Sequence, residues 1–176
     1  MELFWERGYQ ATSTSDLVDH LGIGRASLYA TYGSKHELFL RALDAYIQAR
    51  VTTLTDVLSQ PGPVLPAVRK VLDLFVKRAL DGDRPGCMVV NTAAELAPAD
   101  SEAARRVQAS WVALETGLAS ALTRARAQGE LPADKDPHAL ASFLMVFIQG
   151  VLVVGKGDPN RERLVIASRE ALSILD

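Results

Sequence analysis

The sequence predicts an all-α protein, and two observations carry that prediction. No stretch alternates polar and apolar residues with the period of an exposed strand, and the β-branched runs MVV and VLVV lie within longer helical patterns. Glycines and prolines divide the chain into about nine segments of helical length. Besides single glycines, these breaks lie at residues 60–63, 82–86, 97–100, 129–137 and 155–160.

Length and charge limit the number of domains and the kinds of partner. The 176 residues suffice for one sizeable core, or for a small module joined to a larger one. The formal net charge of −2 and the sequence pI of about 5.9 give no overall positive field for nucleic acid or anionic lipid. Nucleic-acid binding would therefore depend on where positive charges lie along the chain, and we expect no membrane partner.

The sequence gives little support for a disulfide, a metal site or a catalytic site. Cys87 is the single cysteine, which excludes an intramolecular disulfide and fits a reducing compartment. His20, His36 and His138 lack the spacing of metal ligands, so we expect no metal and no cofactor. No order of serine, histidine and carboxylate residues indicates a catalytic site, and no charged leader precedes an apolar run. We expect a cytoplasmic protein that is not an enzyme.

Three short helices are predicted at the N-terminal end. The first ends in the segment LFWERGY. Ser13, followed three residues later by Asp16, has the spacing of a capping box and starts the second helix, and Gly22 supplies its C-terminal stop. Residues 25–31 form the third helix after a short turn.

The second and third helices have the spacing of a helix-turn-helix over residues 13–32, in which the second helix enters the DNA major groove. Arg25, Ser27 and Tyr29 would then be donors for phosphates and base edges. A plain corner between two helices, with Tyr29 as a packed aromatic residue, is the structural alternative. Four apolar residues can pack the two helices together: Leu17, Leu21, Ile23 and Leu28.

Local charge favours DNA binding where the total charge does not. From residue 22 to residue 36 the basic residues are Arg25, Lys35 and His36, and no carboxylate occurs. Small side chains such as that of Ala26 let a helix backbone approach a groove wall. The N-terminal third therefore contains one positively charged edge.

Longer helices are predicted for the rest of the chain. Ser34 and Glu37 form a second capping box that opens a helix running towards Pro61, and the free amides at its start can bind a phosphate beside Lys35. Apolar residues from 107 to 125 recur at steps of three and four, which predicts one buried stripe on a long helix.

The segment GYQATSTSDLVDHLGIGRASLYATYGSKHELFLRAL resembles the N-terminal domain of the TetR family of bacterial transcriptional regulators. That family has a first helix ending in Gly-Phe/Tyr, then Thr/Ser, a helix, Gly-Val-Ser, a recognition helix with Leu-Tyr, an aromatic residue and Lys-x-x-Leu. The resemblance covers about residues 3–45. It implies a helix-turn-helix DNA-binding domain over residues 1–45 and a larger helical ligand-binding and dimerisation domain over residues 46–176.

The resemblance also implies which residues contact DNA, and it shows three departures from the family pattern. Gly24 stands where a serine usually caps the recognition helix, and Ala30 and Thr31 replace a bulkier pair. The family usually has about ten or more residues before LFWERGY, so either residues are missing ahead of Met1 or the first helix is short and DNA affinity is lower. The implied DNA contacts are Thr12, Arg25, Ala26, Ser27, Tyr29 and Lys35.

A homodimer is expected to form through the last two helices. Residues 139–154 are apolar nearly all round but fewer than the roughly 18 to 20 residues that span a bilayer, which predicts a helix buried in the core or at an interface. Helices over about 137–155 and 159–175 are expected to form a four-helix interface. Its expected residues are Phe143, Leu144, Phe147, Val151, Val154, Leu164 and Leu172.

An effector pocket is expected among the central helices, lined by large apolar side chains and a few polar ones. Asn91 and Glu95 lie four residues apart on one helix face and point either into this pocket or to a neighbouring helix. Cys87 lies in a Gly-Cys-hydrophobic-Asn-x-x-x-Glu segment that resembles one group of TetR-like regulators. It is either a sensor thiol or a small buried residue, and we favour the second. The expected pocket residues are Phe75, Met88, Asn91, Glu95, Trp111, Phe143, Phe147 and Gln149.

These expectations combine into one function and one alternative. The first is a ligand-responsive transcriptional regulator, a repressor that binds a two-fold operator as a homodimer and is released by a small molecule. The alternative is a helical ligand-binding or adaptor protein with weak or lost DNA binding, which the acidic pI and the short first helix suggest.

Overall fold

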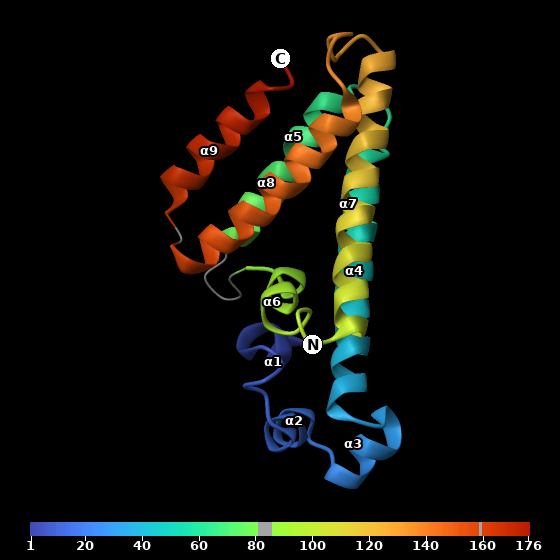
Figure 1. The fold of residues 1–176 in the computed structure, drawn as a ribbon, viewed down its shortest axis with the longest axis vertical. Coiled ribbons are helices and arrows are strands. Elements are labelled where there is room, and N and C mark those ends of the chain that lie inside the picture. Colours follow the sequence, from blue (N-terminus) through green and yellow to red (C-terminus); the bar gives the residue numbers. More distant parts are fainter. Residues whose placement is uncertain (81–85, 159) are drawn as a thin grey trace. The chain divides into compact units, whose positions relative to one another are not determined.

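The computed structural model describes residues 1–80, 86–158 and 160–176, which contain nine α-helices and no strand. The prediction of an all-α fold is thereby confirmed. The break expected at 82–86 lies outside the described residues except for Gly86, and so does Pro159 of the break at 155–160. The helices (Figure 1) are α1 (Glu2–Arg7), α2 (Thr14–Leu21), α3 (Arg25–Tyr32), α4 (Lys35–Leu58), α5 (Val64–Ala79), α6 (Met88–Glu95), α7 (Ser101–Ala127), α8 (Pro137–Gly157) and α9 (Arg161–Ser173).

The chain forms two compact units, which are described separately. Unit 1 comprises Met1–Ala49 and Cys87–Gln108, and unit 2 comprises Arg50–Gly86 and Ala109–Asp176. The division differs from the expected one at residues 45 and 46 because the segment Cys87–Gln108 packs with the N-terminal helices. Helix α6 of that segment contacts α1.

Aromatic residues form the core of unit 1. Phe4 packs edge-on against Phe39 with ring centroids 5.2 Å apart, and Trp5 packs against Tyr46 at 5.1 Å. All four side chains are buried. This core holds α1 against the first half of α4.

The helix-turn-helix occupies the predicted residues. The side-chain oxygen of Ser13 accepts a bond from the backbone N–H of Asp16, and the Asp16 carboxylate accepts from the backbone N–H of Ser13, so the predicted capping box is present. Gly22 ends α2 with φ 64 and ψ 28, the left-handed conformation that favours glycine. Gly24 precedes α3 and supplies no side-chain cap, as its lack of a side chain predicts.

The packing between α2 and α3 uses two of the four residues expected there. Leu17 and Leu28 are buried, whereas Leu21 is exposed and Ile23 is half-buried. The prediction for Leu21 is wrong because Leu21 is the last residue of α2 and is followed at once by the turn.

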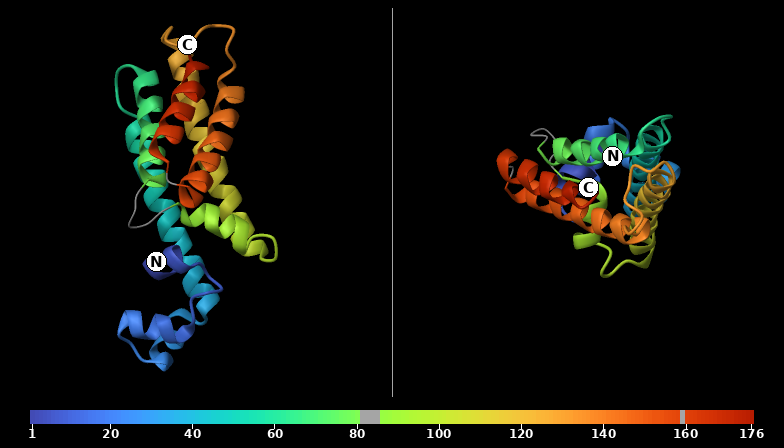
Figure 2. Two further views of the ribbon diagram at one scale, coloured as in Figure 1. Left: turned by 90° about the vertical axis from the view of Figure 1, so that its left-hand side faces the viewer. Right: turned by 90° about the horizontal axis from the view of Figure 1, so that it is seen from above.

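Helices α5, α8 and α9 pack against one another in unit 2 and are coloured green, orange and red in Figure 2. Helix α8 has a buried side and an exposed side, and its buried residues are Pro137, Ala141, Leu144, Ile148, Val151, Leu152 and Gly155. From residues 139–154 we expected a segment too short to span a membrane. The helix has 21 residues and is long and apolar enough to cross one, so its length does not exclude a membrane span. In unit 2 this helix is instead a packed core element.

Polar contacts connect three helix ends in unit 2: the C-terminal ends of α4 and α7 and the N-terminal end of α5. The Glu130 carboxylate accepts from the backbone N–H groups of Val64 and Leu65, which are free donors at the start of α5. Arg124 donates to the Leu58 carbonyl at 2.5 Å. The predicted stripe on α7 is buried at residues 107, 114, 118, 122 and 125.

Substitution of Gly155 tests the close approach of α8 to α5. A Cβ atom at Gly155 would lie 2.6 Å from the Cβ of Ala79 and 2.8 Å from its carbonyl oxygen, so the two helices would have to separate. We expect Gly155→Ala to lower the free energy of unfolding by about 1–3 kcal/mol in urea denaturation, as overpacking does. Gly157→Ala, with open space around it, should change stability by less than about 0.5 kcal/mol. Equal effects of both variants would contradict this packing.

The capping box makes the stability of unit 1 depend on pH. The pKa of Asp16 lies below its ordinary value of 3.8, chiefly because the Ser13 hydroxyl donates to its carboxylate at 2.5 Å. A carboxyl group whose pKa falls on folding stabilises the folded state above the ordinary pKa, and this contribution is lost as pH falls through the lower value. The loss of thermal stability in Asp16→Asn should therefore be greatest at neutral pH and shrink below about pH 3.8.

Circular dichroism melts of the wild type and Asp16→Asn at several pH values measure this difference. Asp19→Asn is the matched control, because it removes an exposed carboxylate from the same helix without touching the box. An Asp16→Asn loss that is the same at acid and neutral pH would contradict the assigned cause.

Candidate nucleic-acid interface

Helix α3 is anchored through one residue and exposes its other faces. Leu28 is 0% exposed, whereas Arg25, Ala26, Ser27 and Tyr29 are all exposed. The helix contains no acidic residue. Its free faces therefore carry a guanidinium group, two hydroxyl groups and a small residue, which suit contact with a phosphate backbone and with base edges.

The Tyr29 hydroxyl is held in place by its neighbours. It lies 3.4 Å from the Thr14 hydroxyl of α2, and Tyr29 remains 40% exposed. The bond with Thr14 lowers the pKa of Tyr29; desolvation opposes this shift, and the positive charge of Arg25 adds to it. Tyr29 is therefore an exposed, oriented group and not a packed core aromatic residue.

The prediction that the Thr12 side chain contacts DNA is wrong for this conformation. Thr12 is 0% exposed, and its hydroxyl donates to the Gly8 carbonyl at 2.6 Å. Its backbone N–H points to the Tyr9 carbonyl at 3.4 Å. Thr12 thus closes the loop between α1 and α2 from inside.

Lys35 lies in the first turn of α4, where free backbone amides favour an anion. Its ammonium nitrogen is 4.3 Å from the centroid of the Tyr9 ring. Ser34 accepts a bond from the Glu37 N–H at 3.1 Å and donates to the Glu37 carboxylate at 3.2 Å, which gives the predicted start of the helix.

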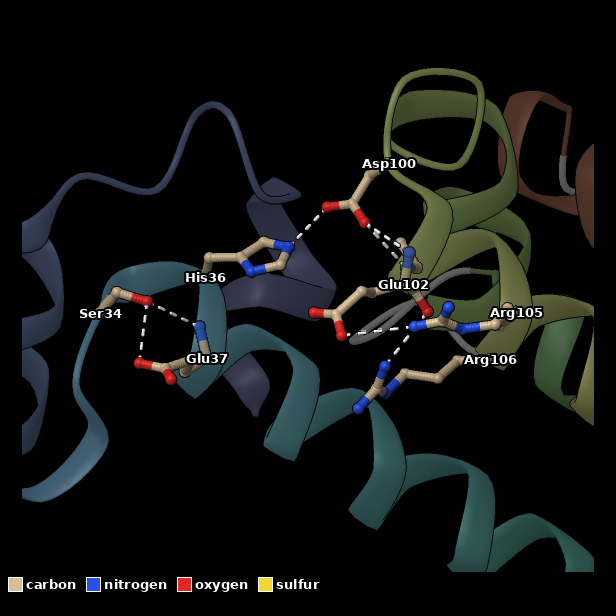
Figure 3. A network of polar contacts seen from close by, with 8 residues as sticks. Ser34, His36, Glu37, Asp100, Glu102, Arg105 and Arg106 are labelled. Atoms are coloured by element: carbon tan, nitrogen blue, oxygen red, sulfur yellow. Dashed lines mark hydrogen bonds and ion pairs between the residues drawn. The ribbon is translucent and has the colours of Figure 1, made fainter.

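Two carboxylates of unit 1 contact this region; the sequence pattern singled out Glu95 without identifying its partners, and it did not indicate Asp100. Glu95 accepts bonds from the backbone N–H groups of Tyr9 and Gln10, at 3.0 and 2.7 Å. Asp100 forms a hydrogen bond with His36, with 2.5 Å between Oδ2 and Nε2 (Figure 3). The sequence separations, 85 or 86 residues for Glu95 and 64 for Asp100, explain why the contacts were missed.

Figure 3 also shows that Asp100 starts helix α7. Its Oδ1 atom accepts from the backbone N–H groups of Glu102 and Ala103, at 2.9 and 3.0 Å. The pKa of Asp100 lies below its ordinary value, chiefly because of the bond from the Ala103 N–H. Desolvation opposes this shift, and His36 and the Glu102 N–H add to it. Asp100 is thus ionised when it faces His36.

The residues expected in an effector pocket are divided between the two units. Met88, Asn91 and Glu95 belong to unit 1, where Met88 is core, Asn91 donates to the Trp5 carbonyl at 3.4 Å, and Glu95 holds the α1–α2 loop. The prediction of these three as pocket residues is corrected, because their side chains are used within unit 1. Asn91 and Glu95 follow the alternative of bonding to neighbouring segments.

Unit 2 contains the other expected pocket residues and a small cavity. Trp111 donates to the side-chain oxygen of Gln149 at 3.2 Å, and the rings of Phe143 and Phe147 stack at 6.1 Å. Phe75 lines a cavity of about 30 Å³ with Arg50, Thr53, Leu54, Val71, Leu74 and Arg78. A wider hollow of about 820 Å³ shares Leu74 and Arg78 in its lining and also includes Lys77, Arg161 and Val165.

The expected dimer interface is wrong at four of its seven residues. Leu144, Val151, Leu164 and Leu172 are buried within unit 2, so they form its core and cannot present a free surface. Phe143 and Val154 are exposed and Phe147 is half-buried. The exposed side of α8 also contains Val146 and Val153. These five residues are called the α8 stripe below.

Cys87 has the surroundings of a packed residue. It is buried, and its sulfur accepts a bond from the Tyr46 hydroxyl at 3.4 Å. It precedes α6 as the N-terminal cap residue without a side-chain bond to the helix. These contacts favour the packing role over the sensor role.

Known proteins resemble both parts of the chain. A model described as bacterial regulatory proteins, tetR family, matches residues 1–42, and one described as tetracyclin repressor-like, C-terminal domain, matches residues 64–167. The uncharacterized HTH-type transcriptional regulator YezE of Bacillus subtilis (strain 168) is 37% identical, over 100% of this chain and 92% of its own. The HTH-type transcriptional repressor ComR of Escherichia coli (strain K12) is 30% identical, over 94% and 80%.

Solved structures share the fold. A cysteine mutant of the TetR family transcriptional regulator CifR, complexed with 26-base-pair operator DNA, has a TM-score of 0.86 and 32% identity, over 99% of this chain and 92% of that chain. The reduced form of NemR from E. coli matches with a TM-score of 0.86 and 21% identity, over 96% and 89%. Proteins of this family are transcriptional regulators and not enzymes. With its helix-turn-helix and its matches along the chain, this protein belongs to the tetR family of bacterial regulatory proteins and is a DNA-binding transcriptional regulator.

Proposed function

We propose that this regulator is a cytoplasmic repressor that binds a two-fold operator as a homodimer and releases it when a small molecule binds. The exposed, carboxylate-free surface of α3 is the observation that carries the proposal. Relatives such as ComR are named transcriptional repressors, which supports repression over activation. We propose no catalytic role and no cofactor.

Five residues are proposed to contact DNA. Arg25, Ala26 and Ser27 begin α3, and the first residues of a recognition helix are those that reach base edges in the major groove. Tyr29 and Lys35 are proposed to bind phosphates, Tyr29 through its oriented hydroxyl and Lys35 through its charge at the start of α4.

A second copy of the chain is proposed to cover the α8 stripe. Its residues lie at the first position and then three, four, ten and eleven positions later, so they fall on one side of α8, which is the pattern of a helix that packs against a partner. Contiguous exposed apolar surface of this kind marks an interaction site in a soluble protein. A dimer would also supply the two recognition helices that a two-fold operator requires.

The effector is proposed to enter unit 2 at the cavity beside Phe75. Its present volume of about 30 Å³ is far below the roughly 300 Å³ of ordinary ligand sites, so effector binding would move the surrounding helices. Arg50, Thr53 and Leu54 of α4 line this cavity, and Lys35 begins the same helix. By thermodynamic linkage, DNA must weaken effector binding by the factor by which the effector weakens DNA binding.

Footprinting on the DNA that flanks the protein's own gene tests the proposal. Protection of a two-fold symmetric sequence is expected. No protected sequence at low salt would favour the alternative of a ligand-binding or adaptor protein with lost DNA binding.

Replacement of Lys35 or Tyr29 by alanine should weaken binding to every DNA sequence, because phosphate contacts carry no sequence information. Lys35→Ala should also make the dependence of log K on log salt shallower by about 0.9, the contribution of one phosphate contact. Fluorescence anisotropy of a labelled duplex over a salt series measures both. Lys70→Ala, which removes an exposed lysine of unit 2, is the control and should leave the slope unchanged. An unchanged slope in Lys35→Ala would remove Lys35 from the interface.

Val146→Glu should dissociate the dimer, because it places a charge within the α8 stripe at a position that is 64% exposed in the single chain. Its fold should persist, since no core contact is lost. Val112→Glu, at a 54% exposed position on α7, is the control and should leave the dimer intact. Light scattering gives the mass, and a Val146→Glu protein that stays dimeric would refute this interface.

A further inference from the structure

The loop between α1 and α2 is held by a carboxylate from α6. Both oxygens of Glu95 are engaged, Oε2 by the backbone N–H of Tyr9 and Oε1 by that of Gln10. Gly8 adopts φ 84 at this point, and a Cβ there would lie 2.6 Å from Oε2 of Glu95. Successive backbone amides form a small anion-binding concavity, and here the protein itself supplies the anion.

The held loop carries the ring on which Lys35 rests. The Lys35 ammonium nitrogen lies 4.3 Å from the Tyr9 centroid, within the range of a cation–π contact. The same ring packs edge-on against Phe39 at 5.1 Å and against His36 at 6.1 Å. Tyr9 is therefore fixed on its backbone by Glu95 and on its ring by α4.

The residue that follows Lys35 is held by the second carboxylate. Asp100 pairs with His36 at 2.5 Å, and the helix-capping bonds to Glu102 and Ala103 fix the position of Asp100 itself (Figure 3). The His36 side chain is about one-third exposed and that of Asp100 less, so water screens this pair only in part.

We propose that Glu95 and Asp100 are positioning residues for the DNA phosphate contact of Lys35. Glu95 acts through Tyr9, and Asp100 acts through His36. The inference rests on the proposed contact between Lys35 and DNA. Both carboxylates belong to the segment Cys87–Gln108 of unit 1, so a displacement of that segment changes the place where the Lys35 ammonium is held.

The direction in which DNA affinity changes distinguishes a positioning role of the carboxylate from a purely electrostatic effect of its charge. Removal of a negative charge from a DNA-binding unit strengthens binding if only long-range electrostatics matters. Glu95→Gln should instead weaken binding, because glutamine offers one acceptor oxygen and turns an NH₂ group towards the second amide. The loop, Tyr9 and the Lys35 ammonium would then lose their fixed arrangement.

The experiment measures the affinity of the full chain for a labelled mixed-sequence duplex over a salt series. Glu95→Gln is expected to lower affinity about 5- to 10-fold and to make the salt slope shallower by close to 0.9, as loss of one phosphate contact does. In a Lys35→Ala background, Glu95→Gln should change affinity by less than about 2-fold, because residues that act through one another are not additive. Asp100→Asn keeps a side-chain oxygen that can accept the capping bonds of α7, so it should also lower DNA affinity, but by less than Glu95→Gln.

Glu102→Gln is the matched control. It removes an exposed carboxylate from the same segment, where Glu102 pairs locally with Arg105, so affinity should be unchanged or slightly higher. Circular dichroism melts check folding, and Asp100→Asn provides the test if Glu95→Gln is unfolded.

Unchanged or tighter binding of folded Glu95→Gln, or a full additional loss in the Lys35→Ala background, would overturn the inference while leaving the contact of Lys35 in place. Failure of Lys35→Ala itself to alter the salt slope would overturn both.

Discussion

The burial of Leu28 is the constraint on which the DNA-reading surface depends. Helix α3 has only eight residues, a length that is unstable in isolation, and Gly24 gives it no side-chain cap. Its position must therefore come from tertiary packing, in which Leu28 is fully buried and Leu17 of α2 is buried with it. Ser27 and Tyr29 lie about 100° around the helix on either side of the buried Leu28, so its packing turns them to the exposed flanks. Arg25 lies one turn before Leu28 and is exposed as the first residue of the helix.

Features set by neighbouring residues were predictable from the sequence, and features set by distant ones were not. The Ser13 box and the stop at Gly22 involve residues within a few positions of each other, and both occur as predicted. Thr12 was misplaced because a hydroxyl next to a turn satisfies the carbonyl four residues back as readily as it meets DNA. The partners of Glu95 and the role of Asp100 were not predicted, because no periodicity links a carboxylate to a partner 64 to 86 residues away.

Helix α8 shows a different limit. Apolar residues on nearly every side give no polar face by which to orient the helix, so the residues facing inward could not be told from those facing outward. The structure sets the rotation through Gly155, where the backbone of α5 at Ala79 comes so close that no larger residue fits. With Gly155 turned towards α5, Leu144 and Val151 fall on the inner side and Val146 and Val153 on the outer. The small size of Gly155 thus decides which apolar residues of α8 remain exposed.

The discontinuity of unit 1 bears on how regulators of this family can be recombined. Engineers who wish to give one regulator the operator preference of another would naturally graft residues 1–49 as a self-sufficient head. In this protein such a graft would leave behind Cys87–Gln108, and with it the acceptors for the Tyr9 and Gln10 amides and the partner of His36. The transferable cassette consists of two separate stretches of sequence, which must be exchanged together.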